Sequence, residues 1–168
     1  NQAEIGGGGF FCQISSSRYA GVGIGLTSIS SYLLLRFGGM GAAIAGTTLY
    51  GDTTVVTLGE VSNPDFCAEF CDMIVRLEGT RWALCIGRHH AILYLSLRTR
   101  ERKGHAGRTI ARIVGREGRA GGHGMMAGGI AFPDRFAPPG YESALAHITE
   151  RYFEVTEAAG RPGIPLLE

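Results

Sequence analysis

The sequence predicts an α/β domain with a mixed β-sheet flanked by helices, and an α+β arrangement is the alternative. Three observations support this fold class. Beyond residue 50, short β-branched or apolar runs alternate with segments of helical periodicity. Two of those runs are separated only by a tight turn at 88–90, which indicates an antiparallel hairpin. A glycine-rich segment between a helix and the following strand is expected to be a loop.

Local patterns place the individual elements. Strands are expected at 53–58, 82–87, 91–98 and 126–132. Helices are expected at 63–79, 105–115 and 142–158. The first helix has Asn63 as its N-cap, Pro64 at its first position and Gly79 as its stop signal. This order of strands and helices, with a hairpin in the middle, is typical of a mixed sheet covered by helices.

The chain of 168 residues suits one domain. Residues 1–48 stay unassigned, 49–160 form the domain, and 161–168 form a loose tail or a docked extended arm. The run "YAGVGIGLTSISSYLLL" at 19–35 is the most membrane-like segment, but it is slightly short and carries hydroxyl residues and glycines. No signal peptide is evident, so we expect a cytoplasmic protein without membrane attachment.

Composition limits the kind of ligand. The formal net charge is +1, so the chain is neither a basic nucleic-acid arm nor an acidic tail, and any anion site must be local. The cysteines at 12, 67, 71 and 85 lack the spacing of a zinc ribbon. Cys67 and Cys71 lie four apart in an apolar pattern, so we expect buried thiols on one helix face. This cysteine usage fits a reducing compartment.

Glycine is unusually frequent, with 27 residues in the chain, about twice the usual share of roughly 7%. Many of them lie in "GREGRAGGHGMMAGG" at 115–129. Gly121, Gly122 and Gly124 allow positive φ, and they allow a ligand to lie directly on main-chain N–H groups. His123 can add a hydrogen bond or a charge to a bound phosphate. The alternative is a glycine-rich crossover whose histidine only caps a helix end.

Cationic residues near this segment extend the candidate site. Arg98, at the end of a predicted strand, could reach the same region with its planar guanidinium, and Arg119 is a second candidate. Arg108 and Arg112 share one helix face and are expected to be solvated. Met126 is expected to point into the sheet.

These residues carry a resemblance to a known family. Residues 121–128 resemble the glycine-rich signature of the DHH-associated domain, the C-terminal half of DHH-family phosphoesterases. The segment 51–87 resembles the strand, helix and strand that open this domain, and "LYLSLRT" at 93–99 resembles a later strand. The polar end of that later strand carries Ser96, Arg98 and Thr99. The resemblance covers roughly half of the chain.

The resemblance implies a site for the phosphate or terminal nucleotide of a substrate. The residues that it assigns to this site are Gly121, Gly122, His123 and Gly124, with Arg98, Ser96 and Thr99 beside them. The family's ligands include nucleotides, short oligonucleotides, cyclic dinucleotides and polyphosphate. In that family a separate DHH domain holds two Mn²⁺ or Mg²⁺ ions that activate water, so a catalytic DHH domain is an implied partner.

The sequence departs from the family in one respect. It contains no Asp-His-His triplet, and its aspartates at 52, 65, 72 and 134 are scattered. Asp65 and Asp72 lie on a predicted helix and are given ordinary structural roles. We therefore expect no catalytic residue, no metal and no cofactor in this chain, which would bind a substrate while a DHH domain cleaves it.

Other functions stay open at this point. The chain could be a stand-alone nucleotide-binding or regulatory module, or a structural or oligomerisation domain in which the glycines only pack. The C-terminal region of alanyl-tRNA synthetase carries a related domain, so an RNA-linked role is a further alternative. The nearly neutral charge disfavours extended nucleic-acid tracking. A homodimer is compatible with the sequence.

Overall fold

The structure is a computed structural model, and it describes residues 40, 41 and 43–167. The membrane-like run at 19–35, Cys12 and most of the unassigned segment 1–48 lie outside the described residues. Within the described part of the chain, no helix is long and apolar enough to cross a membrane.

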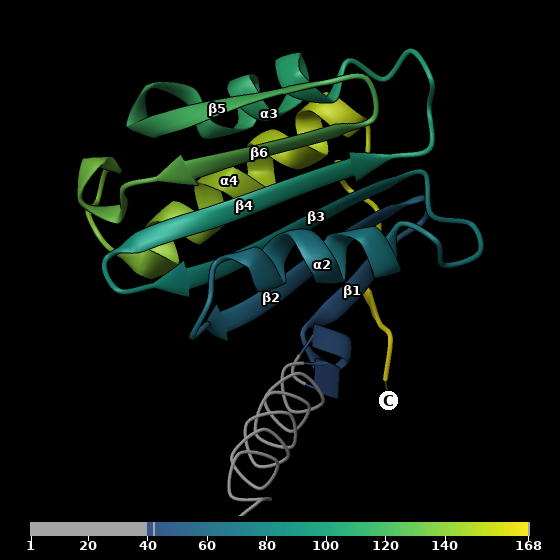
Figure 1. The fold of residues 1–168 in the computed structure, drawn as a ribbon, viewed down its shortest axis with the longest axis horizontal. Helices are drawn as coiled ribbons and strands as arrows, with labels where there is room; N and C mark the ends of the chain where they lie inside the picture. The colour runs from purple at the N-terminus through teal and green to yellow at the C-terminus, as the bar shows by residue number, and fades with distance from the viewer. Residues whose placement is uncertain (1–39, 42, 168) are drawn as a thin grey trace, which may run out of the picture. The chain divides into compact units, whose positions relative to one another are not determined.

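The described residues form a seven-stranded sheet in the order β5-β6-β4-β3-β2-β1-β7 (Figure 1). The strands are β1 (Thr47–Tyr50), β2 (Thr53–Glu60), β3 (Trp82–His89), β4 (Ile92–Thr99), β5 (Gly118–His123), β6 (Met126–Ala131) and β7 (Ile164–Pro165). Strands β2 and β3 are parallel, and every other neighbouring pair is antiparallel. The predicted mixed sheet and the α/β fold class are therefore confirmed.

Helices cover both faces of this sheet (Figure 1). Helix α2 (Asp65–Ile74) lies on one face, and α3 (Ala106–Val114) and α4 (Tyr141–Thr156) lie on the other. Each face has its own core. Leu84, Ile86 and Leu97 are buried with α3 and α4, whereas Val56 and Cys85 are buried with α2.

Local chemistry explains helix α2. The side chain of Asn63 accepts a hydrogen bond from the N–H of Asp65 at 2.9 Å, as a capping side chain does, although the N-cap position is Pro64, one residue later than predicted. Cys67 and Cys71 are 2% and 0% exposed, so the prediction of buried thiols on one helix face is confirmed. The helix ends at Ile74, and turns carry the chain on to Gly79.

The glycine segment differs from the expected loop. A short 3₁₀ turn at Gly115–Glu117 leads into β5, which forms an antiparallel hairpin with β6. Glycine has a low strand propensity, so its pairing here depends on tertiary packing. A side chain at Gly107 of α3 would collide with the main chain of Gly122. Close packing of α3 on a glycine strand thus explains why this segment forms a strand.

The C-terminal tail is a docked extended arm. Strand β7 pairs with β1 at the edge of the sheet, with Ile164 opposite Leu49. Arg161 forms an ion pair with Asp52 at 2.5 Å, in the turn between β1 and β2. The segment expected to be a loose tail or an extended arm thus contributes a two-residue edge strand.

Candidate functional site

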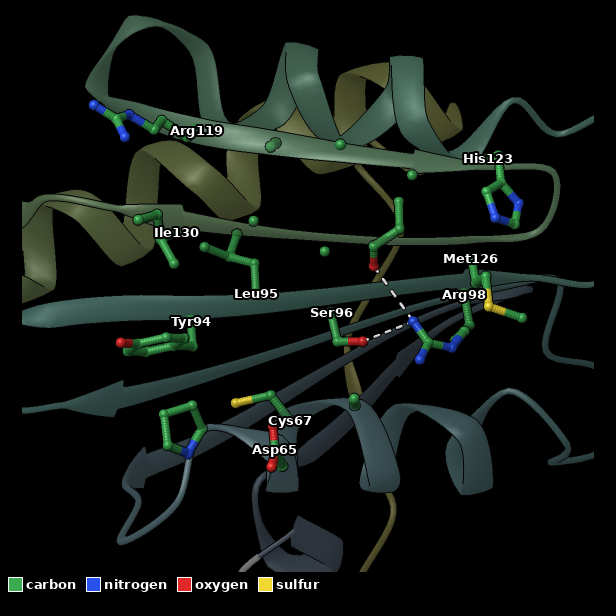
Figure 2. A pocket seen from close by; sticks show the side chains of 18 residues that line it. Asp65, Cys67, Tyr94, Leu95, Ser96, Arg98, Arg119, His123, Met126 and Ile130 are labelled. Atoms are coloured by element: carbon green, nitrogen blue, oxygen red, sulfur yellow. Dashed lines mark hydrogen bonds between the residues drawn. The ribbon is translucent and has the colours of Figure 1, made fainter.

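An open groove lies on the α2 side of the sheet, over β4, β6 and β5 (Figure 2). Its volume is about 720 Å³. Pro64, Asp65 and Ala68 of the first turns of α2 form one wall. The groove exists because α2 packs over β2, β3 and β4 and leaves β5 and β6 uncovered on this face.

The floor of the groove consists of three cross-strand rows. Side chains alternate between the faces of a strand, so every second residue of β4, β6 and β5 points into the groove. The register aligns these residues as Arg98–Met126–His123, Ser96–Gly128–Gly121 and Tyr94–Ile130–Arg119. Polar or cationic side chains thus stand at both ends, with a row of small residues between them.

The middle row leaves the main chain bare. A Cβ built on Gly121 would have no atom within 4 Å, and one on Gly128 would have only the Leu95 carbonyl at 3.6 Å. Ser96 adds a short side chain that is 4% exposed. A ligand can therefore lie directly on the backbone of β5 and β6 at this point.

The other glycines of the segment serve packing and turning. A Cβ on Gly122 would collide with Ala127 on the α3 face of the sheet, and one on Gly118 would collide with the Ile130 carbonyl. Gly124 adopts φ +56 in the β5–β6 turn, and its carbonyl accepts the N–H of Ala106 at 3.1 Å. Gly122 borders the groove only with its main chain, and Gly124 is not part of the lining.

Arg98 lies in the groove, but the protein already holds most of its donors. Its Nε donates to Asp72 Oδ1 at 2.5 Å and its Nη2 to Asp72 Oδ2 at 3.5 Å. Its Nη1 donates to Ser96 Oγ at 2.9 Å (Figure 2). It also donates to the carbonyls of Leu97 at 3.1 Å and Ala127 at 3.3 Å. A guanidinium has five N–H groups, so one N–H on Nη2 is left for a ligand. The side chain is 13% exposed.

Asp72 is a site residue that the sequence reasoning missed. It lies on α2, and its carboxylate faces the only cation of β4 that points into the groove. The sequence did contain a signal for Asp72: it lies seven residues after Asp65, so the two side chains share one face of the helix.

His123 and Arg119 are further side chains with donors that have no partner among the described residues. His123 and Arg119 lie at opposite ends of β5 and line the groove (Figure 2). Both are exposed, and within the described residues neither has a side-chain hydrogen bond or ion pair. His123 was among the predicted site residues, and Arg119 was the second candidate cation.

Thr99 lies outside the groove. Its hydroxyl donates to the Arg81 carbonyl at 3.1 Å and accepts the N–H of Glu101 at 3.1 Å. As the neighbour of Arg98 in β4 it points to the opposite face, and it is buried. Thr99 thus closes the end of β4, whereas Ser96 and Arg98 line the groove.

The expected orientation of Met126 was wrong. Met126 is 52% exposed and lies between Arg98 and His123 on the floor of the groove. Its neighbour Ala127 is buried on the opposite face of the sheet. Because successive side chains of a strand alternate between the two faces, Met126 points into the groove. Arg108 and Arg112 are exposed on α3, as predicted.

The groove offers little nucleophilic chemistry. Cys67 borders it, but burial raises the pKa of its thiol to about 12, so the reactive thiolate is scarce at neutral pH. Within the described part of the chain, no group of three or more His, Cys, Asp or Glu side chains could hold a metal ion. The arrangement suits binding of an anion with an apolar part.

Comparisons with known proteins give the fold a context. No protein-family model and no curated protein matches this chain. Part of an exopolyphosphatase-related protein from Bacteroides fragilis is similar, with a TM-score of 0.54 and 14% identity over 74% of this chain. This chain spans 36% of that protein, and the likeness shows a shared fold. The C-Ala domain of Aquifex aeolicus alanyl-tRNA synthetase matches with a TM-score of 0.46 and 21% identity, over 61% of this chain and 93% of that one.

Proposed function

We propose that this chain is the substrate-recognition domain of a DHH-family phosphoesterase, and that its groove binds the phosphate end of a nucleotide or short oligonucleotide. The observation that carries the proposal is His123, which has no partner among the described residues, beside the exposed main chain of Gly121 and Gly128. The residues of the family-like signature, 121–128, form the β5–β6 hairpin of the groove floor. The shared fold with an exopolyphosphatase-related protein also supports the proposal.

A phosphate would find complementary groups at the His123 end of the groove. The imidazole of His123 donates a hydrogen bond, and it adds positive charge when protonated. The remaining N–H of Arg98 lies across Met126 in the same row. Hydrogen bonds from charged donors to phosphate oxygens are stronger than neutral ones.

Charge also favours one side of the groove. Asp65 and Asp72 lie on α2, which forms the opposite wall, and their carboxylates repel an anion. We therefore place the phosphate on the β5 side, next to His123.

The apolar lining favours a nucleotide over polyphosphate as the ligand. Met126 is half exposed beside His123, and Tyr94 and Ile130 form part of the row at the other end. Bases bind proteins by stacking on aromatic and apolar side chains, whereas polyphosphate has no group that uses such a surface.

Hydrolysis is assigned to another domain. The described residues offer no donor set that fits two divalent cations, and in this proposal Mn²⁺ or Mg²⁺ in a DHH domain supplies the activated water. The role of this chain is to hold the non-reacting end of the substrate, so that binding energy positions the bond to be cleaved.

Calorimetric titration of the full chain tests the proposal. The ligands are adenosine monophosphate, the dinucleotide pApA, inorganic phosphate and a short polyphosphate, each with and without Mn²⁺. We expect metal-independent binding of both nucleotides that weakens about tenfold or more in His123→Ala, because a charge-assisted hydrogen bond is lost. His90→Asn, at an exposed histidine of the β3–β4 turn, is the control and should bind normally.

Three results would contradict the proposal. Equal affinity of the wild type and His123→Ala would mean that the site is elsewhere. Tighter binding of polyphosphate than of pApA would reverse the choice of ligand. Cleavage of pApA by the purified chain with Mn²⁺ would show that hydrolysis needs no other domain.

A further inference from the structure

We infer that Arg119 forms a second anion subsite in the groove, so that the groove distinguishes ligands by length. An oligonucleotide with phosphates at both ends of the groove then binds more tightly than a mononucleotide. This inference rests on the proposed function, because it takes the His123 end as the first phosphate site.

The placement of Arg119 follows from strand geometry. Arg119 and His123 lie on one strand with three residues between them, so their side chains share a face. At about 3.3 Å per residue, their Cα atoms are about 13 Å apart along β5. Figure 2 shows the two side chains at opposite ends of the strand, and both belong to the lining of the same groove.

Arg119 is available to a ligand. Its side chain is exposed, and no described residue forms a hydrogen bond or ion pair with it. Two other arginines near β5 are committed to the protein, since Arg151 pairs with Glu117 at 2.9 Å and Arg98 pairs with Asp72. The free guanidinium of Arg119 can therefore bind a phosphate with two parallel hydrogen bonds.

Between His123 and Arg119, β5 carries no side chain on the groove face. Gly121 lies midway along β5, and Gly128 lies beside it on β6. A Cβ on Gly121 would meet no atom, so the backbone of a linear ligand can pass between His123 and Arg119 without obstruction.

The Arg119 end also has an apolar surface. Ile130 and Tyr94 complete its row across β6 and β4. A second nucleotide can place its base against these side chains while its phosphate contacts Arg119. A mononucleotide has one phosphate, which can occupy only one end of the groove.

The test compares adenosine monophosphate with the trinucleotide pApApA by calorimetry at several salt concentrations. The wild type should bind pApApA about tenfold more tightly, since one further charge-assisted contact is worth about that factor. Arg119→Ala should abolish this advantage and leave the affinity for adenosine monophosphate unchanged. The slope of log affinity against log salt for pApApA should fall by about 0.7, the value for one phosphate contact with a single strand.

Arg112→Ala is the matched control, because it removes the same charge from an exposed site on α3, outside the lining of the groove. It should change neither affinity. An unchanged affinity of Arg119→Ala for pApApA would overturn the second subsite, and so would an equal loss for both ligands. If the wild type binds both ligands with equal affinity and His123→Ala weakens both, the second subsite is overturned but the proposed function is not. Failure of the wild type to bind either ligand would overturn the proposed function along with it.

Discussion

Asp72 of α2 and Arg98 of β4 form a two-contact ion pair across one end of the groove, with Nε 2.5 Å from Oδ1 and Nη2 3.5 Å from Oδ2. The pair fastens α2 to the sheet, and it also takes up the side of the guanidinium that a phosphate would use. Asp72 is 52% exposed and Arg98 is 13% exposed, so the carboxylate can be displaced more easily than the cation. Asp72 thus competes with an anionic ligand for the guanidinium of Arg98.

Replacement of this competitor should strengthen binding. In Asp72→Asn, the charge opposite Arg98 is removed, and we expect the affinity for adenosine monophosphate to rise about fivefold, which corresponds to about 1 kcal/mol. The melting temperature should fall slightly, because an ion pair between α2 and β4 is lost. Calorimetry and thermal unfolding measure the two effects.

Asp65→Asn is the control for this change, because Asp65 lies on α2 and lines the groove but forms no ion pair with Arg98. It should raise the affinity less than Asp72→Asn. Equal gains in affinity from the two variants would mean that the ligand responds only to the total negative charge of α2. No gain in affinity from Asp72→Asn would refute competition between Asp72 and the ligand for Arg98.

Two neighbouring glycines should respond differently to a side chain. Gly121→Val adds its atoms to open space in the groove, so we expect normal stability and at least a tenfold loss of nucleotide affinity. Gly122→Ala places a Cβ against Ala127, and overpacking of this kind costs about 1–3 kcal/mol. Thermal unfolding of both variants and titration of Gly121→Val with adenosine monophosphate check these outcomes. Retained affinity in Gly121→Val would show that ligands do not cross the middle row.

Much of the fold could be predicted because local signals were strong. The β-branched run at 53–58 and the apolar runs on both sides of the turn predicted at 88–90 indicated β2, β3 and β4, although β3 continues to His89. Strand β5 could not be predicted, because its glycines have no strand propensity and pair only where α3 packs on Gly122. Strand β1 was missed although Gly51-Asp52, the two-residue turn before β2, is a recognised hairpin signal.

The candidate site was predictable in part. Ser96, Arg98 and His123 were expected, and they meet in one groove because their strands are neighbours. Thr99 could have been excluded by strand alternation alone, since it follows Arg98 directly. The pairing of Arg98 with Asp72 was beyond sequence reasoning, because it depends on how α2 docks across β4.

The ion pair that anchors the start of β5 should make stability depend on pH. Two hydrogen-bonded contacts with Arg151, at 2.9 and 3.3 Å, lower the pKa of Glu117 below its ordinary value of 4.5. A carboxyl group whose pKa is lowered in the folded state stabilises the protein above its unfolded pKa, and this stabilisation is lost as the pH falls through the folded pKa.

Glu117→Gln should therefore lower the free energy of unfolding by about 1 kcal/mol at pH 7 and by little at pH 3. Urea unfolding of the variant and the wild type at both pH values measures the difference. Glu78→Gln, at an exposed glutamate of the turn after α2, should have little effect at either pH. A loss of stability that is as large at pH 3 as at pH 7 would show that the charge of Glu117 is not the cause.

The buried thiols should be unreactive in the folded protein. Burial raises the pKa of Cys67 to about 12, and it also raises the pKa of Cys85. In a Cys12→Ser variant at pH 8, we expect slow reaction of all remaining thiols with a disulfide reagent, and fast reaction in urea. A thiol that reacts rapidly in the folded state would show that Cys67 is open to the groove.

The most direct test of the central claim is a nuclear magnetic resonance titration of the isotopically labelled chain with adenosine monophosphate. The account predicts that the largest shifts of amide signals fall on Gly121, His123 and Gly128, with smaller shifts at Arg98, and that His123→Ala abolishes them. Shifts that cluster on α4 or at the β3–β4 turn, or the absence of any shift at millimolar ligand, would contradict the assignment of the groove as a phosphate site.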